Sequence, residues 1–238
     1  MNLHLCALLL CAALPAAYAA DRCETKSTAN VPLVVELYTS EGCNSCPPAD
    51  RWLSGLKGRN DVVALAFHVD YWDRLGWVDR FADAAYTRRQ AEQQRLSGGG
   101  FVYTPQVLVD GRDWRRWPTL PEASRASVVE LQLAREGDRV RAQVTPLPGA
   151  PKQLAAYWVA TEDGHVSQVK AGENAGVSLR HDAVVRNYQP VSAFSGAREL
   201  SFASPAVGEG QRPRRVALVV TDARGMPLQA VALSCGGG

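Results

Sequence analysis

The sequence predicts a protein of two parts: an α/β domain over residues 28–122, then a mostly antiparallel, sandwich-like β domain over residues 123–238. In the first part, apolar runs alternate with helical segments. This order is typical of a mainly parallel sheet with helices on its faces. In the second part, short runs are separated by turn residues with no predicted helix between them, as in an antiparallel sandwich.

The first 20 residues have the pattern of a cleaved export signal. The apolar run 3–14 is too short to cross a bilayer, and Ala17-Tyr18-Ala19 offers a small-x-small cleavage site. A short membrane anchor is the alternative, but no second apolar span follows. We therefore expect a periplasmic or secreted protein without a stable membrane span.

The helices and strands of the first part are predicted from apolar runs and from the glycines and turn residues that end them. Two helices are expected, at 49–56 before Gly58 and at 79–96 before Gly98-Gly99-Gly100. Three continuous apolar runs predict buried strands, the last of them turned by Asp110-Gly111. These strands are expected at 31–38, 62–67 and 106–109.

The second part is expected to contain strands only. Several runs alternate apolar and polar residues, as Val140 to Val144 does, and turns follow near Gly137 and Gly164. The predicted strands are 128–134, 139–144, 154–161, 216–221 and 228–233.

Charge excludes some classes of partner. The 26 basic and 24 acidic residues give a formal net charge of +2. A balance this close to zero gives no reason to expect binding to nucleic acid or to an anionic membrane surface.

Four cysteines remain after removal of the export signal: Cys23, Cys43, Cys46 and Cys235. An even number of cysteines in an oxidising compartment makes disulfides the default expectation. Cys23 and Cys235 lie near the two mature ends and are candidates for a structural disulfide. Two unpaired cysteines are the alternative.

Cys43-Asn44-Ser45-Cys46 lies where the first predicted strand gives way to a helix. Two cysteines three apart at such a position are typical of a thiol-disulfide redox site, with Cys43 as the exposed attacking residue and Cys46 as the resolving one. Because Pro47 and Pro48 follow, the helix is expected to begin at Pro47, with the cysteines in the turn before it. An inert structural disulfide and half of a metal site are the alternatives.

Two more segments are candidates for the same site. A cis-proline at Pro105 would present the preceding backbone to a peptide, which makes Tyr103 and Thr104 candidate substrate-binding residues. An ordinary trans-proline is the alternative. Glu36, inside the first apolar run, is a candidate buried carboxylate that exchanges a proton with the resolving thiol. Its alternatives are a sheet edge or a pair with an arginine.

His68 ends the second predicted strand. If the first two strands are parallel, their carboxyl ends share one sheet edge, so His68 is expected near Cys43. His68 is a candidate residue for substrate binding and acid-base chemistry, with a structural hydrogen bond as the alternative. Trp72 follows closely and is a candidate floor for a peptide groove, with ordinary packing as its alternative.

The chain resembles a secreted, thioredoxin-like family catalogued as domain of unknown function 1223. The resemblance implies a thioredoxin-like fold for the α/β domain. It also implies that Cys43 attacks, Cys46 resolves and Pro105 is the cis-proline, and it relates Glu36 loosely to the buried carboxylate. The stretches that carry it are 35–50, 67–73, 75–77 and 102–106, together with 172–174, His181 and 184–186.

These observations predict an exported thiol-disulfide oxidoreductase. Its expected partners are exported protein thiols or disulfides and a redox partner protein, with no small-molecule cofactor and no metal. One alternative is a non-catalytic binding or scaffold protein with a structural disulfide. The other is a copper-handling protein that uses Cys43, Cys46 and His68.

Overall fold

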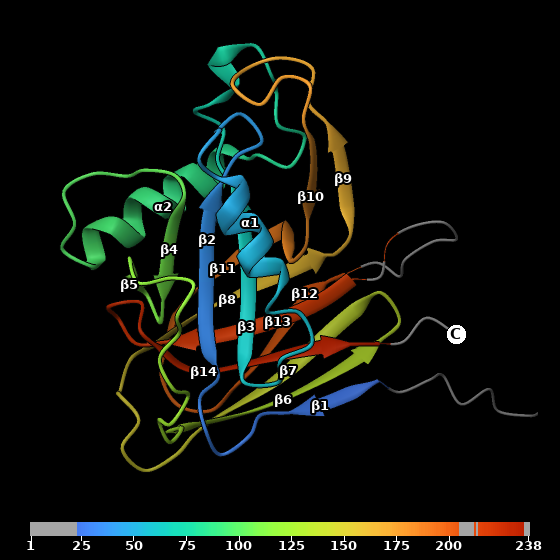
Figure 1. The fold of residues 1–238 in the computed structure, drawn as a ribbon. Helices are drawn as coiled ribbons and strands as arrows, with labels where there is room; N and C mark the ends of the chain where they lie inside the picture. Colours follow the sequence, from blue (N-terminus) through green and yellow to red (C-terminus); the bar gives the residue numbers. More distant parts are fainter. Residues whose placement is uncertain (1–22, 205–211, 213, 236–238) are drawn as a thin grey trace, which may run out of the picture.

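The computed structural model describes residues 23–204, 212 and 214–235 (Figure 1). The predicted export signal, residues 1–20, lies outside the described residues. Strands account for 44% and helices for 12% of the structure, and two α-helices are present in the described part. The expected thioredoxin-like α/β fold with a separate β domain is therefore wrong.

The largest element is an eight-stranded sheet that draws strands from both halves of the sequence. The order is β14-β13-β8-β11-β3-β2-β4-β5. Its strands are β2 (Leu33–Thr39), β3 (Val62–His68), β4 (Gln106–Val109), β5 (Arg112–Asp113), β8 (Leu154–Glu162), β11 (Val184–Phe194), β13 (Arg214–Thr221) and β14 (Pro227–Ser234).

Strand pairing explains why the predicted mainly parallel sheet is wrong. Strands β2 and β3 are parallel over seven residues, and β11 adds one parallel bridge to β3 at Val184 and Ala66. The other pairs of this sheet are antiparallel. The second neighbour of β3 is thus a strand from the second half, which carries Pro190 and exposed polar residues and gives no strong strand signal.

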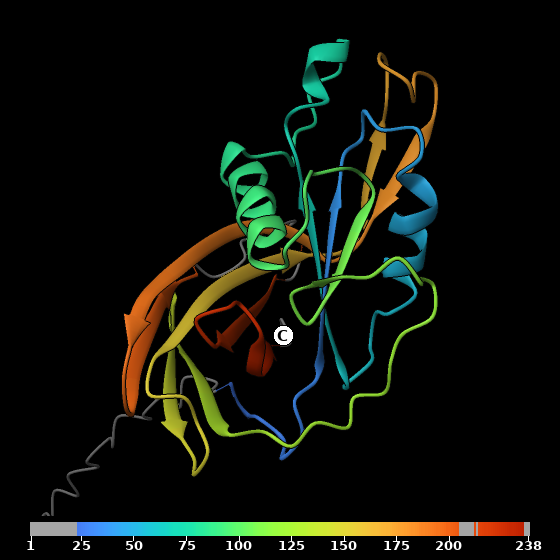
Figure 2. The same ribbon diagram turned by 90° about the vertical axis from the view of Figure 1, so that its left-hand side faces the viewer.

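A second sheet covers one end of the first. Its order is β1-β6-β7-β12, and all its pairs are antiparallel. Leu131, Val140 and Phe202 of this sheet share a core with Trp158 and Leu218 of the larger one, so the two sheets pack face to face (Figure 2). The strands are β1 (Glu24–Lys26), β6 (Val129–Glu136), β7 (Arg139–Pro146) and β12 (Arg198–Ala203).

The two helices, α1 (Pro47–Ser54) and α2 (Ala84–Leu96), lie on opposite faces of β2 and β3. Alternate residues of β2 point to opposite faces. Leu37 therefore packs with Leu53 of α1, whereas Tyr38 packs in the core that contains Tyr86 of α2. No helix among the described residues is long and apolar enough to cross a membrane.

Several local predictions can be compared directly. The start of α1 at Pro47 and the turn at Asp110-Gly111, where both φ angles are positive, are confirmed. Helix α2 begins later than predicted, because Asp83 is its N-cap and accepts a hydrogen bond from the Ala85 amide.

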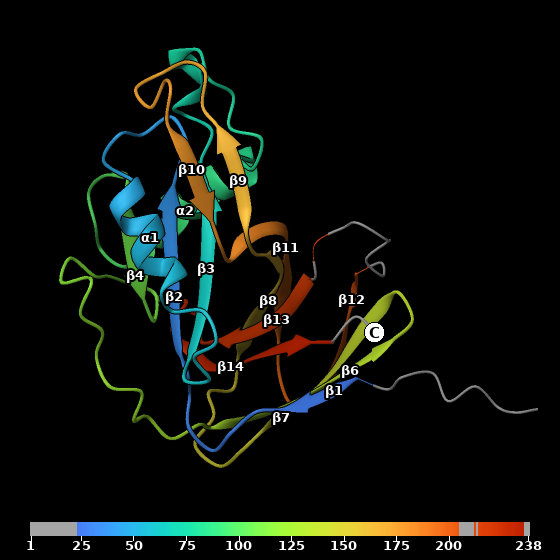
Figure 3. The same ribbon diagram turned by 45° about the vertical axis from the view of Figure 1, so that its right-hand side comes forward.

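The hairpin β9 (His165–Gln168) and β10 (Ser178–His181) forms a separate two-stranded sheet. It lies beside α1 and near the segment 69–83, which includes the short 3₁₀-helix η1 (Asp73–Leu75) (Figure 3). The hairpin and this segment enclose the turn between β2 and α1.

Candidate thiol-disulfide site

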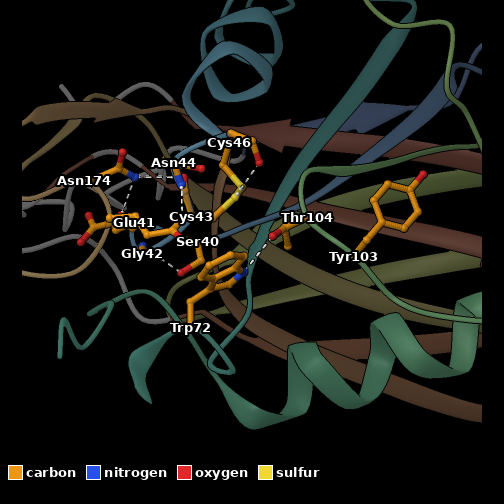
Figure 4. The surroundings of a disulfide bond; sticks show 12 residues. Ser40, Glu41, Gly42, Cys43, Asn44, Cys46, Trp72, Tyr103, Thr104 and Asn174 are labelled. Carbon is orange, nitrogen blue, oxygen red and sulfur yellow. Dashed lines mark hydrogen bonds between the residues drawn. A yellow bond between two sulfur atoms is a disulfide. The ribbon is translucent and has the colours of Figure 1, made fainter. Parts of the chain in front are cut away.

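Both cysteine pairs form disulfides. Cys43 is bonded to Cys46 in the turn before α1, and their Cα atoms are 5.5 Å apart (Figure 4). Cys23 is bonded to Cys235, with Cα atoms 5.6 Å apart, and this bond ties the residue before β1 to the residue after β14.

A compact turn positions the first pair. The Cys43 amide donates to the Ser40 carbonyl at 3.1 Å, and the Gly42 amide donates to the Ser40 hydroxyl at 3.1 Å. A Cβ atom at Gly42 would lie 3.0 Å from the Cβ of Trp72, so a side chain at this position would push the turn away from Trp72. The turn ends in α1, where the Ala49 and Asp50 amides donate to the Cys46 carbonyl.

Cys43 is not the exposed cysteine that the sequence predicts. The side chains of Cys43 and Cys46 are both 0% exposed. The loop between β9 and β10 contributes to this cover: the Asn174 side-chain amide donates to the Glu41 and Cys43 carbonyls, each at 2.9 Å. Asn174 lies 131 residues beyond Cys43, so no local sequence pattern reveals the contact.

A Cys43 thiolate would have the Ser45 hydroxyl group as a neighbouring hydrogen-bond donor. Pro47 and Pro48 begin α1 and have no amide hydrogen, so the helix start lacks its first two donors. The Ser45 Oγ lies 3.4 Å from the Cys43 Sγ. Ser45 therefore provides a polar contact where amides would otherwise be expected.

Two of the predicted substrate-binding residues meet beside the disulfide. The Trp72 indole donates to the Thr104 hydroxyl at 2.8 Å, and both side chains face the bond in Figure 4. The Thr104–Pro105 peptide is cis. The Tyr103 hydroxyl instead donates to Asp113 at 2.7 Å, and its ring points away from the cysteines (Figure 4).

Glu36 lies on the other face of the sheet, under α2. Its carboxylate pairs with Arg89 and accepts hydrogen bonds from the Tyr38 and Tyr157 hydroxyls at 2.9 and 2.6 Å. Because α1 and the cysteines belong to the opposite face, the structure does not bring Glu36 to the disulfide. The pair with an arginine is the alternative that the sequence left open.

His68 lies beneath the turn and is held by a carboxylate. Its Nδ1 is 2.7 Å from Asp79 Oδ2, and both side chains are 0% exposed. Burial alone lowers the pKa of His68, but Asp79 outweighs burial and raises it above its usual value. Burial alone raises the pKa of Asp79, and the His68 charge outweighs it, which lowers that pKa to about 2.

Glu41 connects this pair to a second histidine. Its amide donates to Asp79 at 2.9 Å, and one carboxylate oxygen accepts a hydrogen bond from the Trp77 indole at 2.8 Å. The other oxygen lies 3.3 Å from His181 Nε2. Burial acts to raise the pKa of Glu41, but His181 and other hydrogen-bond donors lower it overall.

Asp50 is a further buried carboxyl group, in the first turn of α1. Burial raises its pKa, while His181 and His68 act in the opposite direction. The sequence did contain a signal for Asp50, since it follows Cys46 by four residues and so shares its helix face. The convergence of Glu41, Asp79 and His181 has no such local signal.

Among residues 23–204, 212 and 214–235, no group of three or more His, Cys, Asp or Glu side chains could hold a metal ion. Cys43, Cys46 and His68, the residues of the copper alternative, do not form such a group in the described part of the chain. A cavity of about 340 Å³ lies at the opposite end of α1, lined by Leu56 and Lys57 among others, and none of the cysteines contributes to it.

Comparison with known proteins identifies a family and a similar fold, and it assigns no reaction. The family model described as a protein of unknown function, DUF1223, matches residues 34–221. A crystal structure of a protein from Agrobacterium tumefaciens has a TM-score of 0.65 and 26% sequence identity, and the match covers 87% of this chain and 96% of that one. HBP35 of Porphyromonas gingivalis has a TM-score of 0.57 at 11% identity, over 87% of this chain and 76% of that one, which shows a likeness of fold alone. No functionally curated protein matches the sequence.

Proposed function

This chain belongs to the DUF1223 family of proteins of unknown function, and we propose that it is an exported thiol-disulfide oxidoreductase that acts on protein substrates. The observation that carries the proposal is the Cys43–Cys46 disulfide at the start of α1, beside buried ionisable groups. The disulfides support export, since cytosolic cysteines are normally kept reduced.

The size of the loop argues against a purely stabilising bond. Cys43 and Cys46 are three residues apart, so closing their loop removes little entropy from the unfolded chain. In the chain-entropy model such a bond contributes about 2 kcal/mol, against about 5 kcal/mol for Cys23–Cys235 with its separation of 212 residues. A stabilising role would also not require charged groups beside the sulfur atoms.

The proposed exchange follows ordinary thiol chemistry. A substrate thiolate attacks the Cys43 sulfur, forms a mixed disulfide and releases Cys46 as a thiolate, which takes up a proton. A second substrate thiolate then displaces Cys43, which leaves the substrate oxidised and the protein as a dithiol. In the opposite direction, Cys43 attacks a substrate disulfide and Cys46 resolves it. A redox partner protein restores the starting state.

Burial means that exchange requires the cover to open. Asn174 holds two carbonyls of the cysteine turn, and the neighbouring Glu173 accepts a hydrogen bond from the Asn44 amide at 3.2 Å. We propose that a bound substrate displaces this loop, while Trp72 and Thr104 contact the substrate chain.

Trapping of mixed disulfides tests the proposal. Cys46→Ser leaves Cys43 without its resolving partner and is expected to accumulate disulfide-linked exported proteins, which non-reducing gels and mass spectrometry would identify. Cys43→Ser is expected to trap none. Cys23→Ser is the control for an unpaired cysteine elsewhere, and equal trapping by that variant would contradict the proposal.

A binding protein with an inert disulfide is the second candidate, and the complete burial of both sulfur atoms favours it. Folded wild-type protein treated with dithiothreitol separates the two functions. An oxidoreductase is expected to lose the Cys43–Cys46 bond without denaturant, whereas an inert bond would open only on unfolding.

A further inference from the structure

Buried polar atoms without a hydrogen-bond partner are concentrated beneath the cysteine turn. In the described part of the chain eight such side-chain atoms occur, and only Arg89 Nε and Trp158 Nε1 belong to other regions. The other six are Thr39 Oγ1, Glu41 Oε1, His68 Nε2, Ser167 Oγ, His181 Nδ1 and His181 Nε2. Two of them, Glu41 Oε1 and His181 Nε2, lie 3.3 Å apart as an ion pair without hydrogen-bond geometry. Unsatisfied buried groups are costly, so their concentration in one place calls for an explanation.

Ionisable groups of this cluster interact with Asp50 from β3 and β10, two of the strands packed against α1, and from the segment before α2. His68 comes from β3 and His181 from β10, and their ring centroids are 4.9 Å apart. Glu41 belongs to the cysteine turn and Asp79 to the segment before α2, where Asp79 is held by His68 and by the Glu41 amide.

Asp50 is the member of this cluster closest in sequence to Cys46. Its amide donates to the Cys46 carbonyl at 3.1 Å, and Cys46 has helical backbone angles, with φ −78° and ψ −35°. Side chains four apart on a helix lie on one face, with about 5–6 Å between their Cβ atoms. Both residues are buried, so they share an environment that disfavours charge.

We propose that Asp50, backed by the His181–Glu41–His68–Asp79 cluster, donates a proton to Cys46 when the disulfide opens and recovers it when the disulfide re-forms. The inference rests on the proposed exchange function and assigns it a proton donor.

Opening of the disulfide moves one electron pair and one proton. When a substrate thiolate bonds to the Cys43 sulfur, the electron pair of the sulfur–sulfur bond leaves with Cys46. The Asp50 carboxyl group gives its proton to that thiolate and becomes a carboxylate. Without this transfer, opening would place an uncompensated thiolate in the buried site. After the transfer, the new negative charge lies on Asp50, which interacts with His68 and His181. Re-formation of the disulfide returns the proton to Asp50.

The unpartnered atoms suit this task. A proton can move, or a histidine ring can change its donor, without first breaking an existing hydrogen bond at His68 Nε2 or at His181 Nδ1. The hydrogen bond between His68 Nδ1 and Asp79 holds the His68 ring in a fixed orientation.

Reduction kinetics test the proposal. The rate at which dithiothreitol opens the Cys43–Cys46 disulfide is measured between pH 5 and 9. Dividing this rate by the concentration of dithiothreitol thiolate removes the titration of the reductant and gives a rate constant. For the wild type, this rate constant is expected to fall as the pH rises through the raised pKa of Asp50. Asp50→Asn, which resembles the protonated side chain in shape, is expected to lose that dependence and to react up to about 100-fold more slowly at the acidic end.

Two further variants sharpen the result. Because His181 lowers the pKa of Asp50, His181→Gln is expected to move the fall in rate to higher pH. Glu92→Gln, on the exposed side of α2, is the control and is expected to follow the wild type. An Asp50→Asn profile that coincides with the wild-type profile would overturn the proton-donor role while leaving disulfide exchange itself intact.

An infrared difference spectrum gives a second readout that does not depend on rates. Between the disulfide form and the mixed disulfide trapped with Cys46 as thiol, the wild type is expected to lose one protonated carboxyl band. That band should be absent from the difference spectrum of Asp50→Asn. If the carboxyl signal of the wild type does not change, the proposal is wrong.

Discussion

The two disulfides join cysteines that are 212 and 3 residues apart, and their surroundings differ as much as their loops. Cys23 and Cys235 are partly buried against the apolar core between the sheets, which includes Leu133 and Leu233. Cys43 and Cys46 are completely buried, and the turn that holds them lies on a group of histidines and carboxylates.

This contrast separates the two roles that a disulfide can have. The long bridge connects the start of β1 to the end of β14 and limits the unfolded chain, while its apolar surroundings offer nothing to an ionised sulfur. The short bridge limits the unfolded chain very little, but it lies beside buried ionisable side chains. Stability measurements should therefore respond mainly to the first bond, and redox measurements to the second.

Removal of each bridge tests this division most directly. The double variant Cys23→Ser/Cys235→Ser is expected to lose up to about 5 kcal/mol of unfolding free energy, and Cys43→Ser/Cys46→Ser about 2 kcal/mol. Urea denaturation of the two variants and the wild type measures both losses. Equal losses would contradict the comparison.

The surroundings of the short bridge are also expected to make stability depend on pH. The pKa of Asp79 is lowered from 3.8 to about 2, so its contribution is present above pH 3.8 and is lost as the pH falls toward 2. The loss amounts to about 2 kcal/mol. The pKa of His68 is raised, so its contribution is present below its usual value of 6.5 and is lost as the pH rises through the raised value.

Unfolding free energy measured against pH should therefore be largest between these two limits. In Asp79→Asn, the part of the loss of unfolding free energy at low pH that comes from the His68–Asp79 pair is expected to disappear. Asp138→Asn, in the exposed turn between β6 and β7, is the control and should retain it. An unchanged decline in Asp79→Asn would show that other carboxylates are responsible.

The same contrast shows what sequence could predict of the fold. The strand 106–109 and the start of α1 were predicted correctly, because apolar runs and the chemistry of proline act locally. The fold class was not, because it depends on partners far apart in the chain. Ala66 pairs with Val184 of β11, and no local pattern contains that choice.

The candidate site divides in the same way. The Cys43–Cys46 spacing, His68 and Trp72 could be noticed from motifs, and the structure places all of them around one turn. Burial of Cys43 could not be predicted, because its cover includes Asn174 from a distant hairpin. Glu36 was chosen for its apolar surroundings, but the alternation of side chains along β2 directs it to the other face.

Weakening the cover should affect the short bridge alone. Asn174→Ala removes two hydrogen bonds to the cysteine turn, each worth about 1 kcal/mol. Because reduction requires the turn to be uncovered, the rate of opening by dithiothreitol is expected to rise by about 5- to 30-fold. Asn60→Ala, at an exposed position beyond the other end of α1, is the matched control. A rate that does not change would show that this loop is not the barrier.

The smallest expected effect concerns the acidity of Cys43 itself. In the reduced protein, the Ser45 hydroxyl is placed to donate to the Cys43 thiolate, because Pro47 and Pro48 supply no amide hydrogens. Ser45→Ala in a Cys46→Ser background is expected to raise the pKa of the Cys43 thiol by about one unit, as loss of one hydrogen bond to a charged group implies. The pH dependence of alkylation by iodoacetamide measures it. Ser54→Ala, at the other end of α1, is the control. A pKa that does not move would mean that the thiolate draws its support from backbone groups after all, and the helix start rather than Ser45 would then set the reactivity of the short bridge.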